Sequence, residues 1–445
     1  MNYKPVIGLE VHVELKTKSK MFCGCSADYF GKTPNTHTCP VCLGLPGALP
    51  IPNKKAIEWC VMIGQALNCK VNSFSKFDRK NYFYPDLPKG YQISQYDQPF
   101  SQNGFIELSN GKKIGITRVH MEEDTGKLLH QGDSTLIDFN RSGVPLVEIV
   151  TEPDFENAKE VVEYLKKLQQ IVRYLGVSDA DMEKGNMRLE PNISLASRNS
   201  HIARSNKRQA KNELPPYKVE VKNINSFRFV EKAIEFEIKR QAEILEKNET
   251  PVQETRGWNE TKNATVSQRI KEEANDYRYF PEPDIPPIHL SESSIRQLAD
   301  QIPEMPDAKL IRFVREYGLS PYDIEILTRE KAQAYYFEEV ITLGKVHEIT
   351  PKQIANFIIN KKPDIPAMHP ADLIKQIIAS KQTGKVNDAE LNSVVKKVLS
   401  ENEKAVSDYK NGKIQVIGFL IGKLRQNLPK ADTVQIKAAL EKYLK

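Results

Sequence analysis

Hydrophobic and polar positions alternate over residues 6–15, and this pattern predicts a β-strand. Successive side chains of a strand point to opposite faces of its sheet, so one face of this strand is apolar. The other face presents titratable side chains, those of Glu10, His12 and Glu14. Residues 114–122 predict a second strand, with a polar side formed by Arg118, His120 and Glu122.

Two segments have the hydrophobic period of an α-helix. Between residues 156 and 175, apolar side chains recur every three or four positions, and Gly176 is suited to end the helix. A second helix is predicted at about residues 227–247. Because strands and helices do not alternate regularly, the pattern favours an α+β domain with an antiparallel sheet.

Proline-containing stretches divide the chain into predicted domains. Residues 276–287 hold four prolines, too many for a helix interior, and predict an extended arm that ends the first domain. The pattern is helical from about residue 291 to 343, and it remains helical after a second proline-containing junction. The predicted domains are residues 1–290 (α+β), residues 291–350 (helical) and residues 351–445 (an all-α tail).

The composition is that of a globular protein, with 40% hydrophobic and 27% charged residues among 445. No apolar run approaches the ~18–20 residues needed to cross a bilayer. Residues 1–13 lack the basic and apolar stretches of a secretory signal. We therefore expect a cytoplasmic protein without a membrane partner.

The net charge of +6 is unevenly distributed. Residues 351–445 contain 17 Lys and Arg against 9 Asp and Glu, a net charge of +8, whereas the first 350 residues carry −2. A basic terminal module suits a partner rich in phosphate groups; a Lys-rich solvated surface of helices is the alternative. The polar, basic residues 201–217 predict an exposed loop or insertion.

Four of the six cysteines are close in sequence: Cys23, Cys25, Cys39 and Cys42. Two such pairs of thiolates can complete the tetrahedral shell of a structural Zn²⁺. We expect zinc-binding, knuckle-like loops at residues 20–45, with free thiols or a redox pair as the alternative, since a reducing compartment disfavours disulfides. Cys60 and Cys69 lie in an apolar, helix-like stretch and are expected to be packing residues.

Crowded carboxylates indicate a cation site. Residues 122–124 place three carboxylates beside a glycine-containing turn, an arrangement that carboxylates avoid unless a cation neutralises them. If the two predicted strands are neighbours, Glu10, His12 and Glu122 converge on Mg²⁺, which prefers oxygen ligands and often bridges to phosphates. A solvated polar strand face is the alternative.

Cationic and aromatic side chains are interleaved over residues 77–86, a mixture suited to a nucleotide or the end of a tRNA. Arg79 and Lys80 are the candidate phosphate ligands there, and an aromatic strand edge with charged flanks is the alternative. Lys222 and Asn223 are further candidates for phosphate or carbonyl recognition. Standard nucleotide-binding motifs are missing from the sequence, so any use of ATP requires a less common fold.

Segments in one order across essentially the whole chain resemble the B subunit of the aspartyl/glutamyl-tRNA amidotransferases. They are residues 6–15 (VIGLEVHVEL), 78–86, 91–95, 140–149, 253–256, 276–284 (DYRYFPEPD), and 412–413 with 418–422. The related archaeal E subunit usually carries an inserted domain for which this length leaves no room.

The resemblance implies a cradle-like catalytic domain, a helical domain and a helical tail that contacts tRNA. It implies ATP-dependent phosphorylation of the side-chain carboxylate of Glu on mischarged tRNA(Gln), or of Asp on mischarged tRNA(Asn). Ammonia from a separate amidase subunit then displaces phosphate, and another, small subunit completes a heterotrimer. The implied Mg²⁺ and catalytic residues are Glu10, His12 and Glu122. Arg79 and Lys80, followed by Lys222 and Asn223, remain the candidate phosphate ligands on the evidence of their own sequence context. No DNA partner is expected.

Three features depart from the family pattern. Some members lack the four cysteines, so zinc is expected to stabilise the fold without entering the reaction. Glu190 stands where Asp is common, and residues 201–218 form a longer segment than the family suggests. The alternatives are a non-catalytic tRNA-binding scaffold, against which the intact carboxylates argue, and a zinc hydrolase, which a closed Cys₄ shell disfavours.

Overall fold

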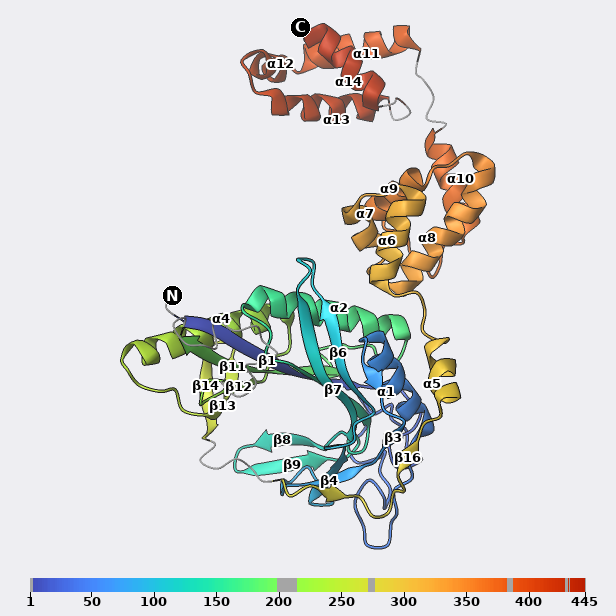
Figure 1. The fold of residues 1–445 in the computed structure, drawn as a ribbon. Helices are drawn as coiled ribbons and strands as arrows, with labels where there is room; N and C mark the ends of the chain where they lie inside the picture. Colours follow the sequence, from blue (N-terminus) through green and yellow to red (C-terminus); the bar gives the residue numbers. More distant parts are fainter. Residues whose placement is uncertain are drawn as a thin grey trace. The chain divides into compact units, whose positions relative to one another are not determined.

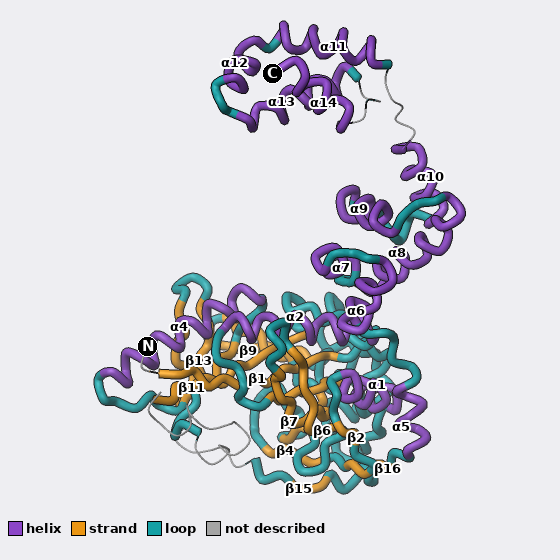
Figure 2. Tube along the Cα trace, turned by 45° about the horizontal axis from the view of Figure 1, so that its top comes forward, coloured by secondary structure: helices purple, strands orange, loops and turns teal. Residues whose placement is uncertain are grey.

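The computed structural model divides the chain into two compact units, Met1–Lys309 and Leu310–Lys445. It describes residues 3–197, 214–270, 277–381, 387–428, 431 and 433–444. Most of the predicted exposed loop at 201–217 lies outside these ranges. All described strands belong to the first unit, and the described part of the second unit is helical (Figures 1 and 2).

A nine-stranded sheet is the centre of the first unit. Its strands are β1 (Tyr3–Glu14), β2 (Lys70–Val71), β6 (Ser101–Glu107), β7 (Lys113–Glu123), β10 (Pro145–Thr151), β11 (Met187–Ser197), β12 (Val219–Lys222), β13 (Glu254–Asn259) and β14 (Ala264–Ile270). They lie in the order β14-β13-β12-β11-β1-β10-β7-β6-β2. The two strands predicted from alternation are confirmed as β1 and β7.

Seven of the eight ladders in this sheet are antiparallel, as predicted, and the ladder between β12 and β13 is parallel. Parallel neighbours need a crossover connection, and helix α4 (Phe227–Glu246) supplies it. The sheet is therefore mixed at this one ladder.

Three helices cover one face of the sheet: α1 (Lys54–Ala66), α2 (Ala158–Leu175) and α4 (Figure 1). The predicted helix at 156–175 is confirmed as α2. Asn157 caps its first turn, and Gly176 ends it with a left-handed φ of 73°. Val11 and Val13 of β1 are fully buried in the core with these helices, and each such side chain contributes roughly 1.5–3 kcal/mol by leaving water.

A shift in register decides which side chains of β7 face away from the helices. Val150 of β10 pairs with Arg118, but the next residue, Thr151, pairs with Ile116, so Thr117 is an extra residue. Such a bulge exchanges the two faces of a strand. Ile116 is therefore buried in the core, while Arg118 lies on the opposite, polar face, two positions before His120.

Smaller sheets lie on the side of the large sheet opposite α2 and α4 (Figure 1). Their strands are β3 (Phe74–Ser75), β4 (Asp78–Asn81), β5 (Tyr91–Ser94), β8 (Lys127–Gln131), β9 (Ser134–Asp138), β15 (Phe280–Pro281) and β16 (Ile288–His289). β4 pairs with both β5 and β15, β16 pairs with β3, and β8 forms a hairpin with β9. The predicted extended arm is confirmed in part: its described residues 277–287 contain no helix and include strand β15, but residues 283–285 form a turn.

The segment after the arm is helical, as predicted. The helices are α5 (Glu292–Ala299), α6 (Pro306–Tyr317), α7 (Pro321–Leu327), α8 (Lys331–Gly344), α9 (Pro351–Lys361), α10 (Pro370–Lys381), α11 (Asp388–Glu401), α12 (Glu403–Lys410), α13 (Ile417–Asn427) and α14 (Thr433–Leu444). Helices α6 to α10 share one buried cluster, which contains residues on both sides of position 350, and α11, α13 and α14 share another. Within the described ranges, no helix has both the length and the hydropathy of a membrane span.

Candidate active site and metal-binding groups

A row of titratable side chains crosses the polar face of the central strands. His12 on β1 pairs with Glu148 on β10, and Glu148 pairs in turn with His120 on β7. β10 therefore lies between β1 and β7, so the condition that these two strands are direct neighbours is not met. Side chains of β1 and β7 still meet across it.

His12, Glu122 and Glu148 form what we call the histidine–carboxylate group. His12 Nε2 lies 3.8 Å from a carboxylate oxygen of Glu122 and 3.8 Å from one of Glu148. One ligand atom from each residue falls within 4.8 Å of the others. One nitrogen and two carboxylate ligands of this kind fit a divalent cation.

Charged neighbours keep both carboxylates of this group ionised. Burial alone would raise the pKa of Glu122, but Lys80, 3.6 Å away, and the histidines hold that pKa well below its usual range. Burial also opposes ionisation of Glu148, yet His120, with Nε2 3.1 Å away, lowers its pKa to about 2. Ser94 donates a 2.7 Å hydrogen bond to Glu122 and helps fix its orientation.

Glu10 belongs to a second group, the carboxylate group, with Glu190 and Glu220. Their oxygens also lie within 4.8 Å of one another, and Glu10 opposes Glu190 across the ladder of β1 and β11. Lys222 Nζ lies 3.0 Å from Glu190 and 3.3 Å from Glu220. Burial raises the pKa of Glu190, although Lys222 opposes that rise. The structure thus brings His12 and Glu122 together and places Glu10 in a separate group.

The other predicted phosphate ligands have different surroundings. Arg79 makes a bidentate ion pair with Glu282, with hydrogen bonds of 2.7 and 2.8 Å, and stands 4.3 Å from the centroid of the Tyr91 ring. Its guanidinium therefore ties the extended arm to β4. Asn223 is exposed directly after β12 and has a left-handed φ of 62°.

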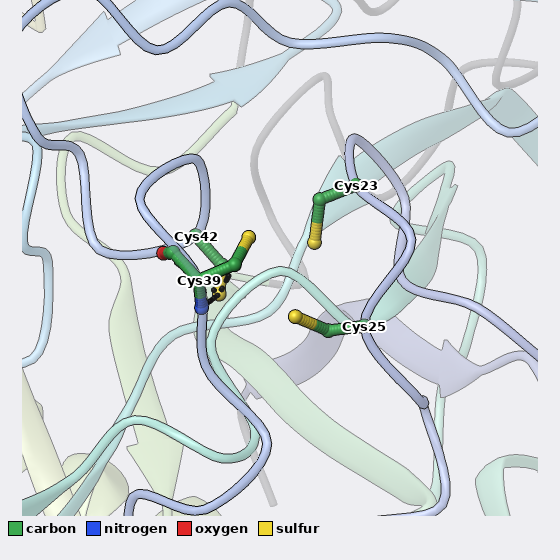
Figure 3. A group of neighbouring side chains, drawn as sticks. All are labelled: Cys23, Cys25, Cys39 and Cys42. Atoms are coloured by element: carbon green, nitrogen blue, oxygen red, sulfur yellow. Dashed lines mark hydrogen bonds between the residues drawn. The ribbon is translucent and has the colours of Figure 1, made fainter.

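The four predicted cysteine ligands, which we call the cysteine group, converge from two loops (Figure 3). Their sulfur atoms lie within 4.8 Å of one another. A hydrogen bond from Cys23 is the main reason that the pKa of Cys42 falls to about 4. Cys60 is fully buried in the core and Cys69 is half-buried against it, as expected of packing residues.

A buried lysine supports the assignment of these cysteines to a metal. Lys20 is fully buried, donates a 2.8 Å hydrogen bond to the carbonyl of His37, and lies 3.6 Å from Cys42 Sγ. Among the described residues, no carboxylate forms an ion pair with it. A buried ammonium needs compensating negative charge, which metal-bound thiolates would supply. The residues therefore fit a thiolate-bound metal such as Zn²⁺.

Reasoning from sequence missed three residues of these sites: Glu148, Glu220 and Lys20. Glu148 is the lone charged residue among the apolar positions of β10, and this isolation is the signal that could have found it. Lys20 adjoins the first cysteine pair in sequence, but nothing in its local pattern predicts that its ammonium is buried.

Comparisons with known proteins agree with this architecture. The family model described as the GatB/GatE catalytic domain matches residues 5–296, and one described as the GatB domain matches residues 322–444. Among similar proteins named as the B subunit of aspartyl/glutamyl-tRNA(Asn/Gln) amidotransferase, one from Thermosipho melanesiensis is 45% identical over the whole of both chains. One from Thermotoga maritima is 44% identical over 100% of this chain and 99% of its own. One from a Thermoanaerobacter species is 46% identical over 95% of each chain.

Proposed function

We propose a function from one premise: the chain belongs to the B-subunit family of the aspartyl/glutamyl-tRNA(Asn/Gln) amidotransferases. It is the amidating subunit, which converts Glu on mischarged tRNA(Gln), Asp on mischarged tRNA(Asn), or both, to the amide with ATP. The observation that carries this proposal is the convergence of His12, Glu122 and Glu148 from three strands.

The reaction proceeds in two balanced steps. A side-chain carboxylate oxygen of the aminoacyl group forms a bond to the γ-phosphorus of ATP, and the bond from that phosphorus to ADP breaks. Ammonia then forms a bond to the carbonyl carbon of the acyl phosphate. The carbon–oxygen bond to phosphate breaks, inorganic phosphate leaves, and the nitrogen loses a proton to give the neutral amide.

The histidine–carboxylate group holds Mg²⁺ in this proposal. The ion, when bound, neutralises charge on the phosphoryl group and aligns it with the attacking oxygen. Ionised Glu122 and Glu148 are ready to bind a cation without first losing a proton. Lys80 Nζ, 3.6 Å from Glu122, is placed beside that site to contact phosphate oxygens.

The carboxylate group, which contains Glu10, offers a second cation site on the same sheet face. Its three acidic side chains exceed the single positive charge of Lys222, which pairs with two of them. A cation bound there would relieve the remaining repulsion. Lys222 and Asn223 are suited to phosphate recognition beside it, while Arg79 acts by holding the arm.

The remaining parts support catalysis without taking part in it. The cysteine group binds a structural Zn²⁺ as a knuckle-like insertion within a cradle-like domain. Residues 351–445 form a basic tail that contacts the tRNA backbone. A separate amidase subunit supplies ammonia, and another, small subunit completes a heterotrimer in the cytoplasm.

The test is ATP-dependent conversion of Glu-tRNA(Gln) to Gln-tRNA(Gln), with ammonium chloride as nitrogen donor and with the amidase and small subunits present. We expect activity in the wild type and a loss of ~10²-fold or more in Glu122→Gln, since a group that stabilises transition-state charge is removed. Glu10→Gln tests the carboxylate group in the same way. Glu107→Gln is the matched control, because Glu107 is exposed at the end of β6.

Two other outcomes would contradict the proposal. Full activity in Glu122→Gln would eliminate the histidine–carboxylate group as the metal site. An inactive wild type that still binds tRNA would favour the non-catalytic scaffold.

A further inference from the structure

The guanidinium of Arg118 lies on the polar face of the sheet and has no partner among the residues that the structure describes. In the described part of the chain its side chain takes part in no ion pair or hydrogen bond, and its Nε is buried and unpaired. A buried donor without an acceptor destabilises the fold, because it has lost its hydrogen bond to water and gained none in return. Such an exception to the usual pairing of buried polar groups calls for an explanation.

Neighbouring arginines show what a structural role looks like in this unit. Arg188 on β11 donates a 2.6 Å hydrogen bond to Asp124, and Arg79 is held by both oxygens of Glu282. Arg256 contacts Glu254 at 2.6 Å and Glu237 at 3.1 Å. Each of these side chains is neutralised by a carboxylate within the protein. The N–H donors of Arg118 have no such carboxylate among the described residues and can therefore bind an external anion.

The register of the sheet places Arg118 beside the proposed reaction centre. Arg118 pairs with Val150, and Val150 pairs with Glu10 of the carboxylate group. The apolar side chain between them accepts no hydrogen bond. The adjacent row, which contains His120 and Glu148, is one side-chain repeat along the strands, roughly 7 Å away. Arg118 therefore borders both acidic groups and is paired with neither.

The extended arm covers the same patch. Tyr279 is half-buried and stacks on Tyr96, with ring centroids 4.3 Å apart and an interplanar angle of 12°. Burial raises the pKa of Tyr279 to about 12, and the charges that act on it include those of Lys80 and Arg118. Arg118 is itself half-buried, with a buried Nε, so its attraction to an anion is stronger than that of a guanidinium in open solvent.

The bulge at Thr117 determines the direction of the Arg118 side chain. Regular alternation would give Arg118 the same face as Ile116, which is buried in the core. The extra residue turns Arg118 to the polar face instead. Bulges often change the direction of side chains next to active sites. This bulge places the positively charged side chain of Arg118 in the same cross-strand row as Val150 and Glu10.

We propose that Arg118 is a substrate-binding residue that holds two oxygens of a reacting oxyanion, either the aminoacyl carboxylate or a phosphoryl group of ATP. This inference rests on the proposed function. The planar fork of a guanidinium matches both anions through two parallel hydrogen bonds. Binding would supply the acceptors that Arg118 lacks and would place the anion beside the histidine–carboxylate group and the carboxylate group.

The experiment uses the complete assembly, with the amidase and small subunits, and compares Arg118→Gln and Arg118→Lys with wild type. kcat and KM are measured separately for ATP and for Glu-tRNA(Gln), again with ammonium chloride. We expect kcat/KM to fall ~10²-fold or more in Arg118→Gln, and Arg118→Lys to recover only part, because an ammonium cannot reproduce the fork. Arg228→Gln is the control, since Arg228 is an exposed arginine on α4.

The two substrates separate the sources of the anion. A KM increase confined to ATP would identify a phosphoryl group as the anion that Arg118 binds. A KM increase confined to Glu-tRNA(Gln) would identify the aminoacyl carboxylate. A fall in kcat without a change in either KM would mean that Arg118 binds oxygens only in the transition state of phosphoryl transfer. Each of these results supports the proposal.

Other outcomes would overturn it. Arg118→Gln activity equal to that of Arg228→Gln would show that the guanidinium binds no substrate, and full recovery by lysine would show that the fork is not used. If both Arg118 variants lose their cooperative thermal unfolding, Arg118 is structural. An inactive wild type would instead contradict the proposed function itself, so the two failures are distinguishable.

Discussion

The cysteine group and the histidine–carboxylate group contrast in how the chain builds them. The four cysteines come from two irregular loops separated by 13 residues in sequence. His12, Glu122 and Glu148 come from three hydrogen-bonded strands that are distant in sequence. Strand ladders position the second group before any cation binds, whereas the loops of the first have no ladder between them.

The cysteine group is therefore expected to depend on its metal for its structure, whereas the histidine–carboxylate group is held in place by the fold. Removing a metal from irregular loops is expected to release the loops, because metal binding at such a site is coupled to the folding of the loops that carry its ligands. Removing one from a sheet leaves the strands paired and affects only chemistry. Loss of a ligand should therefore disturb structure in the cysteine group and chemistry in the histidine–carboxylate group.

Removal of the cysteine-bound metal is expected to unfold residues 20–45 locally. Binding of a structural zinc can supply on the order of 10 kcal/mol, so Cys39→Ser should lose bound metal and protection from hydrogen exchange across these loops. Elemental analysis and hydrogen-exchange mass spectrometry measure the two effects. Cys69→Ser, which alters a cysteine outside the group, serves as control, and a Cys39→Ser protein that retains a full equivalent of metal would refute the assignment.

The same contrast explains which parts of the site could be predicted from sequence. The cysteines are local, and their spacing alone was enough to predict that the sulfurs converge. Alternation placed Glu10 and His12 on one polar face, but it could not reveal that β10 lies between β1 and β7, because strand order depends on pairing between distant segments. The bulge at Thr117 has no sequence signal of its own, so the orientation of Ile116 could not be predicted.

The helices show the complementary case. Gly176 and the hydrophobic period predicted α2 to within two residues of its observed start and at its observed end. Both signals act within a few turns of one segment and need no information about partners. The grouping of Glu10 with Glu190 and Glu220 required three strands in register, and such information is spread along the whole chain.

Glu14, on the same strand as His12, contacts the segment between the cysteine pairs and is expected to make the stability of the fold depend on pH. It accepts a 3.0 Å hydrogen bond from Tyr29, between the cysteine pairs, and burial together with Asp124 raises its pKa from 4.5 to about 8. An acid whose pKa is raised by folding favours the folded state when protonated, so its contribution is present below pH 4.5 and is lost as the pH rises to about 8.

Glu14→Gln should remove this dependence. The unfolding free energy of wild type relative to Glu14→Gln is expected to fall by on the order of 4 kcal/mol between these two pH values. Urea unfolding at several pH values measures the difference, with Glu107→Gln as the exposed control. Parallel stability curves for wild type and Glu14→Gln would contradict the expectation.

Glu148→Gln tests whether the histidine–carboxylate group is held by the sheet. The substitution keeps the shape of the side chain and leaves the β10 ladders to β1 and β7 intact. We expect amidation to fall ~10²-fold, which corresponds to about 2.7 kcal/mol, with little change in thermal unfolding. A variant that loses its fold and its activity together would show that this group, like the cysteine group, depends on its ligands for structure.

Lys20→Met isolates the charge beside the cysteine group and has the smallest expected effect. Methionine keeps a long apolar stem in the fully buried position but removes the ammonium 3.6 Å from Cys42 Sγ. A Zn²⁺ bound by four thiolates carries a net negative charge, so loss of the nearby cation should weaken metal affinity about tenfold, the lower end of the effect of groups that support metal ligands.

Competition with a chromophoric chelator measures that affinity, and exposed Lys18 provides the matched variant Lys18→Met. Lys18 is two residues from Lys20 in the same loop, so equal weakening in both variants would indicate a general effect of charge on the loop. Unchanged affinity in Lys20→Met would mean that the carbonyls of His37 and Phe139 account for the buried ammonium. Weakening confined to Lys20→Met would show that even the locally encoded group depends on one charge that its cysteine spacing does not reveal.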